Sequence, residues 1–305
     1  NDVGRVAATG SVRVTEKMSF ESAARGAAAA RTRFEEATRQ AATGLKVEHP
    51  EDDPAAAGLI ARHRHQVDQT AALTSAMDAA NAELDTADGA LDGIGTDLSR
   101  ARELAVQLSN ATYSANERAA AAAEVDGLFK HALGLLNTKA GHRYLFGGFQ
   151  DDAPPFDATG AYLGDTGVRQ VEVAAGVRLD ASVRADVALK GVGGGTDVLG
   201  VLQALSAALS ANNVAGVQNS LTGLDAGIGQ VALARGELGG HQSVLDAASS
   251  ATRVAHVDAQ ARLSGLADAD AIDAATALAQ AQQGLEAVLA ALGKTLNGPS
   301  LLDRL

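Results

Sequence analysis

Apolar residues recur along one stretch of the chain at alternating intervals of four and three positions. The unbroken series comprises Leu73, Met77, Ala80, Leu84, Ala87, Leu91, Ile94, Leu98, Ala101, Ala105 and Leu108. This spacing places one narrow apolar seam along a helix, and such a seam needs a partner helix to cover it. At about 1.5 Å per residue the stretch makes a rod of roughly 50 Å. The pattern therefore predicts an elongated, mainly α protein in which long helices pack side by side.

Capping residues place the helices of the N-terminal part. Residues 14–43 carry a weak apolar face, and Gly44 is a natural helix stop. Asp53 is a favourable N-cap, followed by Pro54 at the first helical position. A helix is therefore predicted from Pro54 through the apolar seam to about Asn110. Residues 1–11 are rich in Gly and Ala without periodicity, and we expect them to be an unstructured leader.

A third helix is predicted shortly after the second. Ser114 and Glu117 form a Ser-x-x-Glu capping box. The seam of this helix consists of Ala122, Val125, Phe129, Ala132 and Leu136. Because the connection is short, the second and third helices should be antiparallel neighbours. The glycines at 89, 93 and 95 weaken the second helix, unless they let a neighbouring segment come close.

The amino-acid composition of the chain changes at Gly141. Residues 141–156 combine aromatics, glycines and a Pro-Pro pair, as is typical of a loop. Residues 169–183 then alternate between apolar and polar on both sides of a turn at 174–176, which predicts a small β-hairpin. The glycine-rich residues 191–195 should close this β-rich insert as a flexible joint.

Helical spacing returns after the insert. Leu199, Leu202, Leu205 and Leu209 mark a short helix, and a second long rod begins at Val217 with a seam that becomes polar beyond Leu238. Residues 263–270 are predicted to interrupt the helical pattern. Asp270 and Asp273 can cap the last helix, and the sequence Asn-Gly-Pro at 297–299 should end it. The predicted architecture is a bundle of long antiparallel coiled-coil helices with a small β-rich insert.

Composition narrows the functional classes. The 305 residues have a formal net charge of −12, no cysteine, no tryptophan and 3% aromatics. The negative charge argues against nucleic-acid binding, and the lack of cysteine excludes disulfides and thiolate metal sites. No segment reaches the ~20 apolar residues of a membrane span. We find no Sec-type signal sequence, which permits either the cytoplasm or a dedicated export machine.

Candidate reactive groups have simpler interpretations. His63 and His65 are two positions apart, so on a helix they point to different sides, and no third metal ligand is evident. Asp52 and Asp53 fit a helix cap better than an acid/base pair. The glycines at 191–195 do not match a phosphate-binding loop, and no nucleophile motif occurs. We therefore expect no catalytic site, cofactor or metal.

Several motifs together resemble the bacterial flagellin superfamily. They are Thr43-Gly44-Leu45, Asp52-Asp53-Pro54-Ala55, Arg102-Glu103-Leu104-Ala105, Ser109-Asn110, Leu263-Ser264 and Ser300-Leu301-Leu302. The similarity covers residues 12–149 and 215–305. Within the superfamily, the sequence Tyr-Leu-Phe-Gly-Gly-Phe at 144–149 with Pro-Pro-Phe at 154–156 resembles the hook-associated protein 3 type. Members of that type begin at a Met followed by Arg, which aligns with Val12-Arg13, and we hypothesise that the native chain starts at Val12.

The resemblance implies a secreted, non-enzymatic subunit of the bacterial flagellum at the junction of hook and filament. It implies a ring of copies, contacts with the hook-side junction protein and flagellin, and export by a chaperone and the flagellar type III apparatus. The expected division is a leader at 1–11, terminal assembly segments at 12–52 and 264–305 that are disordered in the monomer, a helical rod at 53–149 and 198–263, and the insert at 150–197. The predicted assembly residues are Met18, Phe20, Phe34, Leu45, Tyr144, Phe146, Phe149, Leu285, Leu289, Leu292, Leu296, Leu301 and Leu302.

Several alternatives stay open at this point. Each seam can close within one subunit or with a neighbour, and we expect closure within the subunit for 54–110 and 217–256 and on assembly for 14–43 and 271–296. The aromatics at 144–149 form either a partner-binding patch or pins that hold the insert on the helices. Filament flagellin is the close functional alternative, and a cytoplasmic coiled-coil scaffold protein is the alternative from another class.

Overall fold

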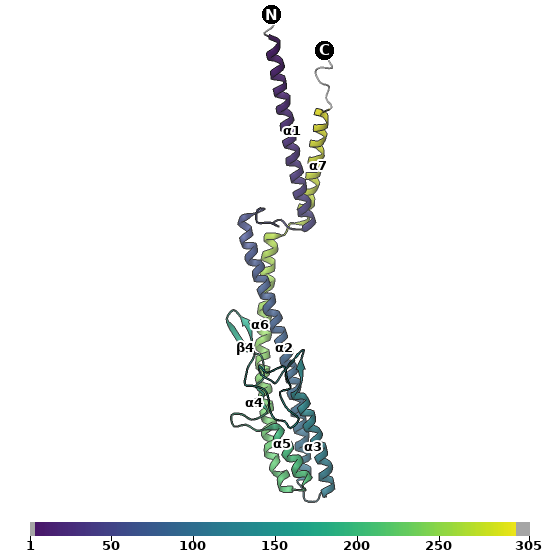
Figure 1. The fold of residues 1–305 in the computed structure, drawn as a ribbon, viewed down its shortest axis with the longest axis vertical. Coiled ribbons are helices and arrows are strands. Elements are labelled where there is room, and N and C mark those ends of the chain that lie inside the picture. The colour runs from purple at the N-terminus through teal and green to yellow at the C-terminus, as the bar shows by residue number, and fades with distance from the viewer. Residues whose placement is uncertain (1–3, 297–305) are drawn as a thin grey trace. The chain divides into compact units, whose positions relative to one another are not determined.

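The computed structural model describes residues 4–296. Helices make up most of it, so the predicted mainly α fold class is confirmed (Figure 1). The elements are α1 Gly4–Thr43, α2 Pro54–Leu108, α3 Ala115–Leu136, β1 Lys139–Ala140, β2 Arg143–Tyr144, β3 Gln170–Ala174, β4 Val177–Asp180, α4 Ala185–Ala188, α5 Val198–Ser210, α6 Val214–Ala267 and α7 Ala271–Leu296. The chain divides into two compact units, Asn1–Val67 with Val257–Leu305 and Asp68–His256.

The predicted seam of α2 is the core of the second unit. Every seam residue from Met77 to Leu108 is buried, and Leu73 is packed against the same core. The matching positions of α6 that are fully buried are Val217, Leu224, Val231, Leu238 and Leu245. The seam of α6 continues beyond Leu238 through polar residues, because Ser249 is buried and its hydroxyl lies 3.3 Å from Oδ1 of Asp78. Closure of these two seams within the subunit is confirmed.

Polar pairs connect α2 and α6 on one side of the seam. They are Asp78–Arg253, Asn81–Asp246, Asp85–Gln242 and Asp88–Arg235. The α2 members of these pairs directly follow seam positions, so they flank the apolar contact on one side. The order of the pairs runs in opposite directions along the two helices, which makes α2 and α6 antiparallel.

Helix α3 covers α2 as its predicted antiparallel neighbour. Ser114 and Glu117 form the capping box, with the Ser114 N–H donating to the Glu117 carboxylate at 2.7 Å. A Cβ on Gly93 would lie 2.6 Å from Cδ1 of Leu135. Gly93 therefore allows the close approach of α3, whereas a Cβ on Gly89 would meet open space.

The predicted β-hairpin is present as β3 and β4. Val171 pairs with Leu179 in an antiparallel register, and the turn contains Gly176 at φ 75°. The glycines at 191–195 form a turn held by Gln230, whose side chain accepts from the Thr196 N–H at 2.8 Å and donates to the Ala188 carbonyl at 2.9 Å. This segment is thus a fixed turn, where the sequence predicted a flexible joint.

Two predicted helix boundaries are wrong. Helix α1 includes residues 4–11, which we expected to be an unstructured leader; no Pro interrupts them, and Ala7 and Ala8 have high helix propensity. Helix α6 extends to Ala267, so the break predicted at 263–270 is confined to residues 268–270. Asp270 caps α7 as predicted, because its carboxylate accepts from the Ile272 N–H at 2.8 Å. The predicted stop at 297–299 lies outside the described residues.

Candidate assembly surfaces

The end of α1 and the start of α7 meet in a backbone-paired junction. The Lys46 and Val47 N–H groups donate to the Ala267 carbonyl at 2.6 and 3.2 Å, and the Ala269 N–H donates to the Gly44 carbonyl at 2.8 Å. Gly44 has φ 71°, which favours glycine. The apolar cluster beside the junction consists of Val47, Ile60, Ala267, Leu45, Ala56, Leu263 and Leu266. Leu45, predicted as an assembly residue, is half-buried in this cluster.

Asp52 orders the loop that follows. Its carboxylate accepts from the His49 N–H at 2.9 Å and the Glu48 N–H at 3.0 Å, and it pairs with Nη2 of Arg39 at 3.1 Å. The backbone hydrogen bonds lower the pKa of Asp52, because they stabilise the charged carboxylate. Asp53 caps α2 through the Ala55 and Ala56 N–H groups. The two carboxylates are thus loop and cap residues.

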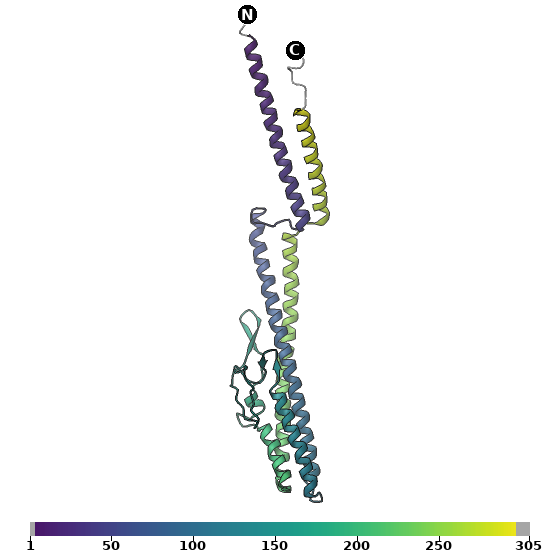
Figure 2. The same cartoon turned by 45° about the vertical axis from the view of Figure 1, so that its right-hand side comes forward.

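Helices α1 and α7 lie side by side within the first unit but bury little (Figures 1 and 2). Among the side chains described in these two helices, Ala37 and Ala274 are the buried apolar ones. Phe34, Leu285 and Leu289 line a hollow of about 590 Å³ between the helices. The contact between α1 and α7 is therefore thin.

The predicted assembly residues of α1 and α7 are largely accessible. Met18 is 63%, Phe20 51% and Leu289 54% exposed. Phe34, Leu285 and Leu292 are half-buried, and Leu296 is the last residue of α7. Leu301 and Leu302 lie outside the described residues. Ile272, near the start of α7, is 77% exposed and lies off the 4-3 spacing of the predicted seam.

The aromatic side chains of residues 144–149 lie partly in the core and partly on the surface. Phe146 is fully buried, so its prediction as an assembly residue is wrong, and it pins the insert to the helices. Tyr144 is half-buried, and Nζ of Lys139 lies over its ring, 4.4 Å from the ring centroid. Phe149 is 65% exposed and remains available to a partner.

The Pro-Pro-Phe motif packs into the same core as Phe146. Phe156 is 1% exposed, and its ring centroid lies 5.1 Å from that of Tyr162. The Tyr162 hydroxyl donates to the carbonyls of Phe146 and Asp165 at 3.1 and 2.8 Å. Burial raises the pKa of Tyr162 to about 12, because the phenolate would lose hydration. The two aromatic motifs thus belong to the same apolar core as the helices.

Ion pairs that the sequence analysis missed attach the insert to α2. Glu83 pairs with Arg143 and, at 3.2 Å, with Nη2 of Arg169. Asp151 pairs with Nη1 of Arg169 at 3.2 Å. These residues are far apart in the sequence, so no local spacing indicates that they meet.

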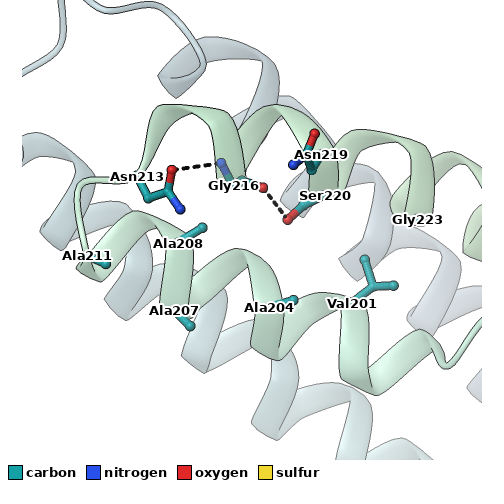
Figure 3. Close-up of a pocket in the computed structure, with 10 residues that line it drawn as sticks. All are labelled: Val201, Ala204, Ala207, Ala208, Ala211, Asn213, Gly216, Asn219, Ser220 and Gly223. Carbon is teal, nitrogen blue, oxygen red and sulfur yellow. Dashed lines mark hydrogen bonds between the residues drawn. The ribbon is translucent and has the colours of Figure 1, made fainter.

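A shallow hollow of about 480 Å³ lies between α5 and the start of α6 (Figure 3). Its lining is composed of small or amide residues, and none of its ten residues is charged. A Cβ on Gly216 would lie 2.9 Å from Cβ of Ala208, so this glycine permits the close approach of α5 and α6. The hollow contains no group suited to acid/base catalysis or metal binding.

Within residues 4–296, we find no group of three His, Asp or Glu side chains that would hold a metal ion. His63 and His65 lie on α2 without a third candidate ligand beside them. No helix in this range is long and apolar enough to cross a bilayer.

Parts of this chain are similar in sequence to known proteins. Residues 14–151 match the family model of the bacterial flagellin N-terminal helical region. Flagellar hook-associated protein 3 of Escherichia coli is 30% identical over 155 residues, which are 50% of this chain and 49% of that protein. The Salmonella typhimurium protein of the same name is 29% identical over the same length. The chain thus spans about half the length of the curated relatives it matches.

Solved structures share the fold. A putative flagellar hook-associated protein from Vibrio parahaemolyticus aligns with a TM-score of 0.65 and 24% identity, over 71% of this chain and all of that chain. FlgL of Bacillus cereus aligns with a TM-score of 0.58 and 20% identity, over 68% of this chain and 99% of that one. The chain therefore has the fold of these flagellar proteins, and residues 14–151 resemble the bacterial flagellin N-terminal helical region.

Proposed function

We propose that the chain is a structural subunit of the bacterial flagellum that joins the hook-associated region to the filament. Its role is non-enzymatic, and copies assemble through α1 and α7. The supporting observation is the contrast between the seams: that of α2 is closed within the subunit, whereas Met18, Phe20 and Leu289 on the terminal helices are more than half exposed. Exposed apolar side chains grouped on helices are typical of surfaces that become buried on association.

The proposed partners are further copies in a ring, the hook-side junction protein and flagellin. Before assembly the chain would be exported through the flagellar type III apparatus with a chaperone and would act outside the cell. The thin α1–α7 contact supports this route, because a pair of helices with few buried side chains is easily unfolded. We propose that both terminal segments are disordered in the monomer.

A deletion strain tests the function. Cells lacking the gene should fail to retain or elongate filaments, and expression of the full chain should restore motility. Purified flagella should contain the chain in a few copies at one end. Thousands of copies along the filament would instead identify a filament flagellin, and a chain that stays in the cell body after flagella are sheared off would indicate a cytoplasmic scaffold protein.

A further inference from the structure

A cavity of about 400 Å³ lies between the insert and α6, which we call the Leu233 pocket. Its apolar interior includes Leu238, 2% exposed, and Ala188, 6% exposed. At its rim Leu233 is 73% and Val187 41% exposed. Exposed large apolar residues around a concave site are typical of a contact surface.

The rim of the Leu233 pocket is negatively charged. It carries Asp180, Arg184, Glu237 and His241. The guanidinium of Arg184 is neutralised by the Asp186 carboxylate at 2.6 Å. Asp180 accepts a hydrogen bond from the Gln170 amide, which leaves its charge in place. Glu237 forms no ion pair with any described residue. The pocket therefore suits an apolar side chain accompanied by a cation.

The tip of the β3–β4 hairpin, residues 174–178, offers that combination. Val177 is 54% exposed, and Arg178 beside it is exposed without an ion pair to a described carboxylate. The cross-strand partner of Arg178 is Glu172, whose carboxylate accepts from the Gly176 N–H at 3.1 Å. The hairpin projects from the insert in both views (Figures 1 and 2). Its tip thus presents an apolar side chain beside a cation, with the Glu172 carboxylate on the opposite strand.

We infer that the hairpin tip of one copy binds in the Leu233 pocket of a second copy, with Val177 against Leu233 and Arg178 against Glu237. The contact is heterologous, since two different surfaces meet, and repeated contacts of this kind can close into a ring. This inference rests on the proposed function, because it assigns one contact between neighbouring copies. The area that one hairpin tip buries in the pocket is smaller than the roughly 800 Å² that each partner buries in a stable interface. The contact should therefore form at high protein concentration or within an assembly, where many copies act together.

Disulfide cross-linking tests the contact, because the natural chain has no cysteine. Full-length Val177→Cys and Leu233→Cys proteins are mixed at high concentration and oxidised. We expect the mixed 177–233 dimer to exceed the amount formed by random collision. Leu163→Cys is the matched control for collision, since Leu163 is 58% exposed on the insert but does not line the pocket. A 177–233 yield no higher than the 177–163 yield would overturn the inference.

A charge exchange gives a second measurement in the same assay. Arg178→Glu should lower the 177–233 yield about fivefold, as expected for reversal of one exposed ion pair. Combining Arg178→Glu on one protein with Glu237→Arg on the other should restore the 177–233 yield. A yield that stays low would count against the contact between Arg178 and Glu237. Circular dichroism of each variant verifies folding. If the natural chain restores motility in the deletion strain but the Val177→Cys and Leu233→Cys proteins show no excess cross-link, the inference fails while the proposed function stands.

Discussion

Nη1 of Arg118 donates to Oδ1 of Asn212 at 2.6 Å, and this bond connects α3 to the turn between α5 and α6. Arg118 is 3% exposed. Its Nε donates to the Leu108 carbonyl at 3.1 Å and its Nη2 to the Asn110 carbonyl at 2.7 Å, so the cation also satisfies the C-terminal end of α2. Asn212 has φ 52°, a conformation that Asn tolerates better than most residues. One buried side chain therefore holds two interhelical connections together.

Replacing Arg118 should strongly destabilise this end of the helical unit. Arg118→Met leaves the Leu108 and Asn110 carbonyls and the Asn212 amide without their donor, and we expect a loss of about 3 kcal/mol in the free energy of unfolding. Urea denaturation followed by circular dichroism measures it. Lys130→Met on the same helix is the control, because Lys130 is exposed, and it should change stability by less than about 0.5 kcal/mol. Equal effects of the two substitutions would contradict the assigned role.

Truncations of two leucines should separate folding from assembly. Leu91 is fully buried in the α2 seam, so Leu91→Ala should lower the free energy of unfolding by about 3 kcal/mol. Leu289 on α7 is 54% exposed, so Leu289→Ala should change monomer stability by less than about 0.5 kcal/mol. In the deletion strain, however, Leu289→Ala should reduce motility. Normal motility with Leu289→Ala would exclude a role of this side chain in assembly.

The seams could be predicted from sequence because they depend on local spacing. A 4-3 apolar pattern determines which face of a helix is buried whatever its partner is, and the burial of Leu91, Ile94 and Leu98 follows directly. Caps are equally local: Asp53 and Ser114 bond backbone groups within three residues. These features required no knowledge of the tertiary structure.

The features that sequence reasoning missed depend on distant partners. Arg118 was indistinguishable from a surface cation until Asn212, 94 positions away, was placed beside it. The aromatic motif posed the same problem, because identical phenylalanines at 146 and 149 have opposite exposure. The Tyr162 hydroxyl donates to the Phe146 carbonyl and the Asp165 carboxylate accepts from the Phe149 N–H, and no local pattern indicates that these residues approach the motif.

Gly148 should tolerate substitution less well than Gly176. Both have positive φ, at 70° and 75°. A Cβ on Gly148 would lie 2.1 Å from Oδ1 of Asp165, whereas a Cβ on Gly176 would meet open space. Gly176→Ala should therefore cost about 1 kcal/mol from backbone strain alone, and Gly148→Ala about 3 kcal/mol, because Asp165 must also move. Urea denaturation measures the free energy of unfolding of both variants. A similar loss of stability in the two would show that Asp165 moves away from the new Cβ at little cost.

The capping box should make stability depend on pH. Hydrogen bonds from the Ser114 N–H and hydroxyl lower the pKa of Glu117 below the ordinary value of 4.5. A carboxyl whose pKa is lower in the folded state stabilises the fold above its unfolded pKa and loses that contribution as pH falls through the folded pKa. Glu117→Gln should thus be less stable than wild type at pH 7, and the gap should narrow as pH falls below about 4.5. A gap that stays constant down to pH 3 in urea titrations would contradict this origin.

Hydrogen exchange should distinguish the terminal helices from the closed seam. Ordering the backbone costs about 1 to 2 kcal/mol per residue, and the thin α1–α7 contact offers little burial to offset it. Amides of residues 12–43 and 271–296 should therefore exchange within seconds in a dilute monomer, while those of residues 91–108 stay protected. Assembled flagella provide the comparison, because neighbouring copies should cover α1 and α7 and slow their exchange. Strong protection of both terminal helices in the monomer would show that they close on each other, and assembly would then have to use other surfaces.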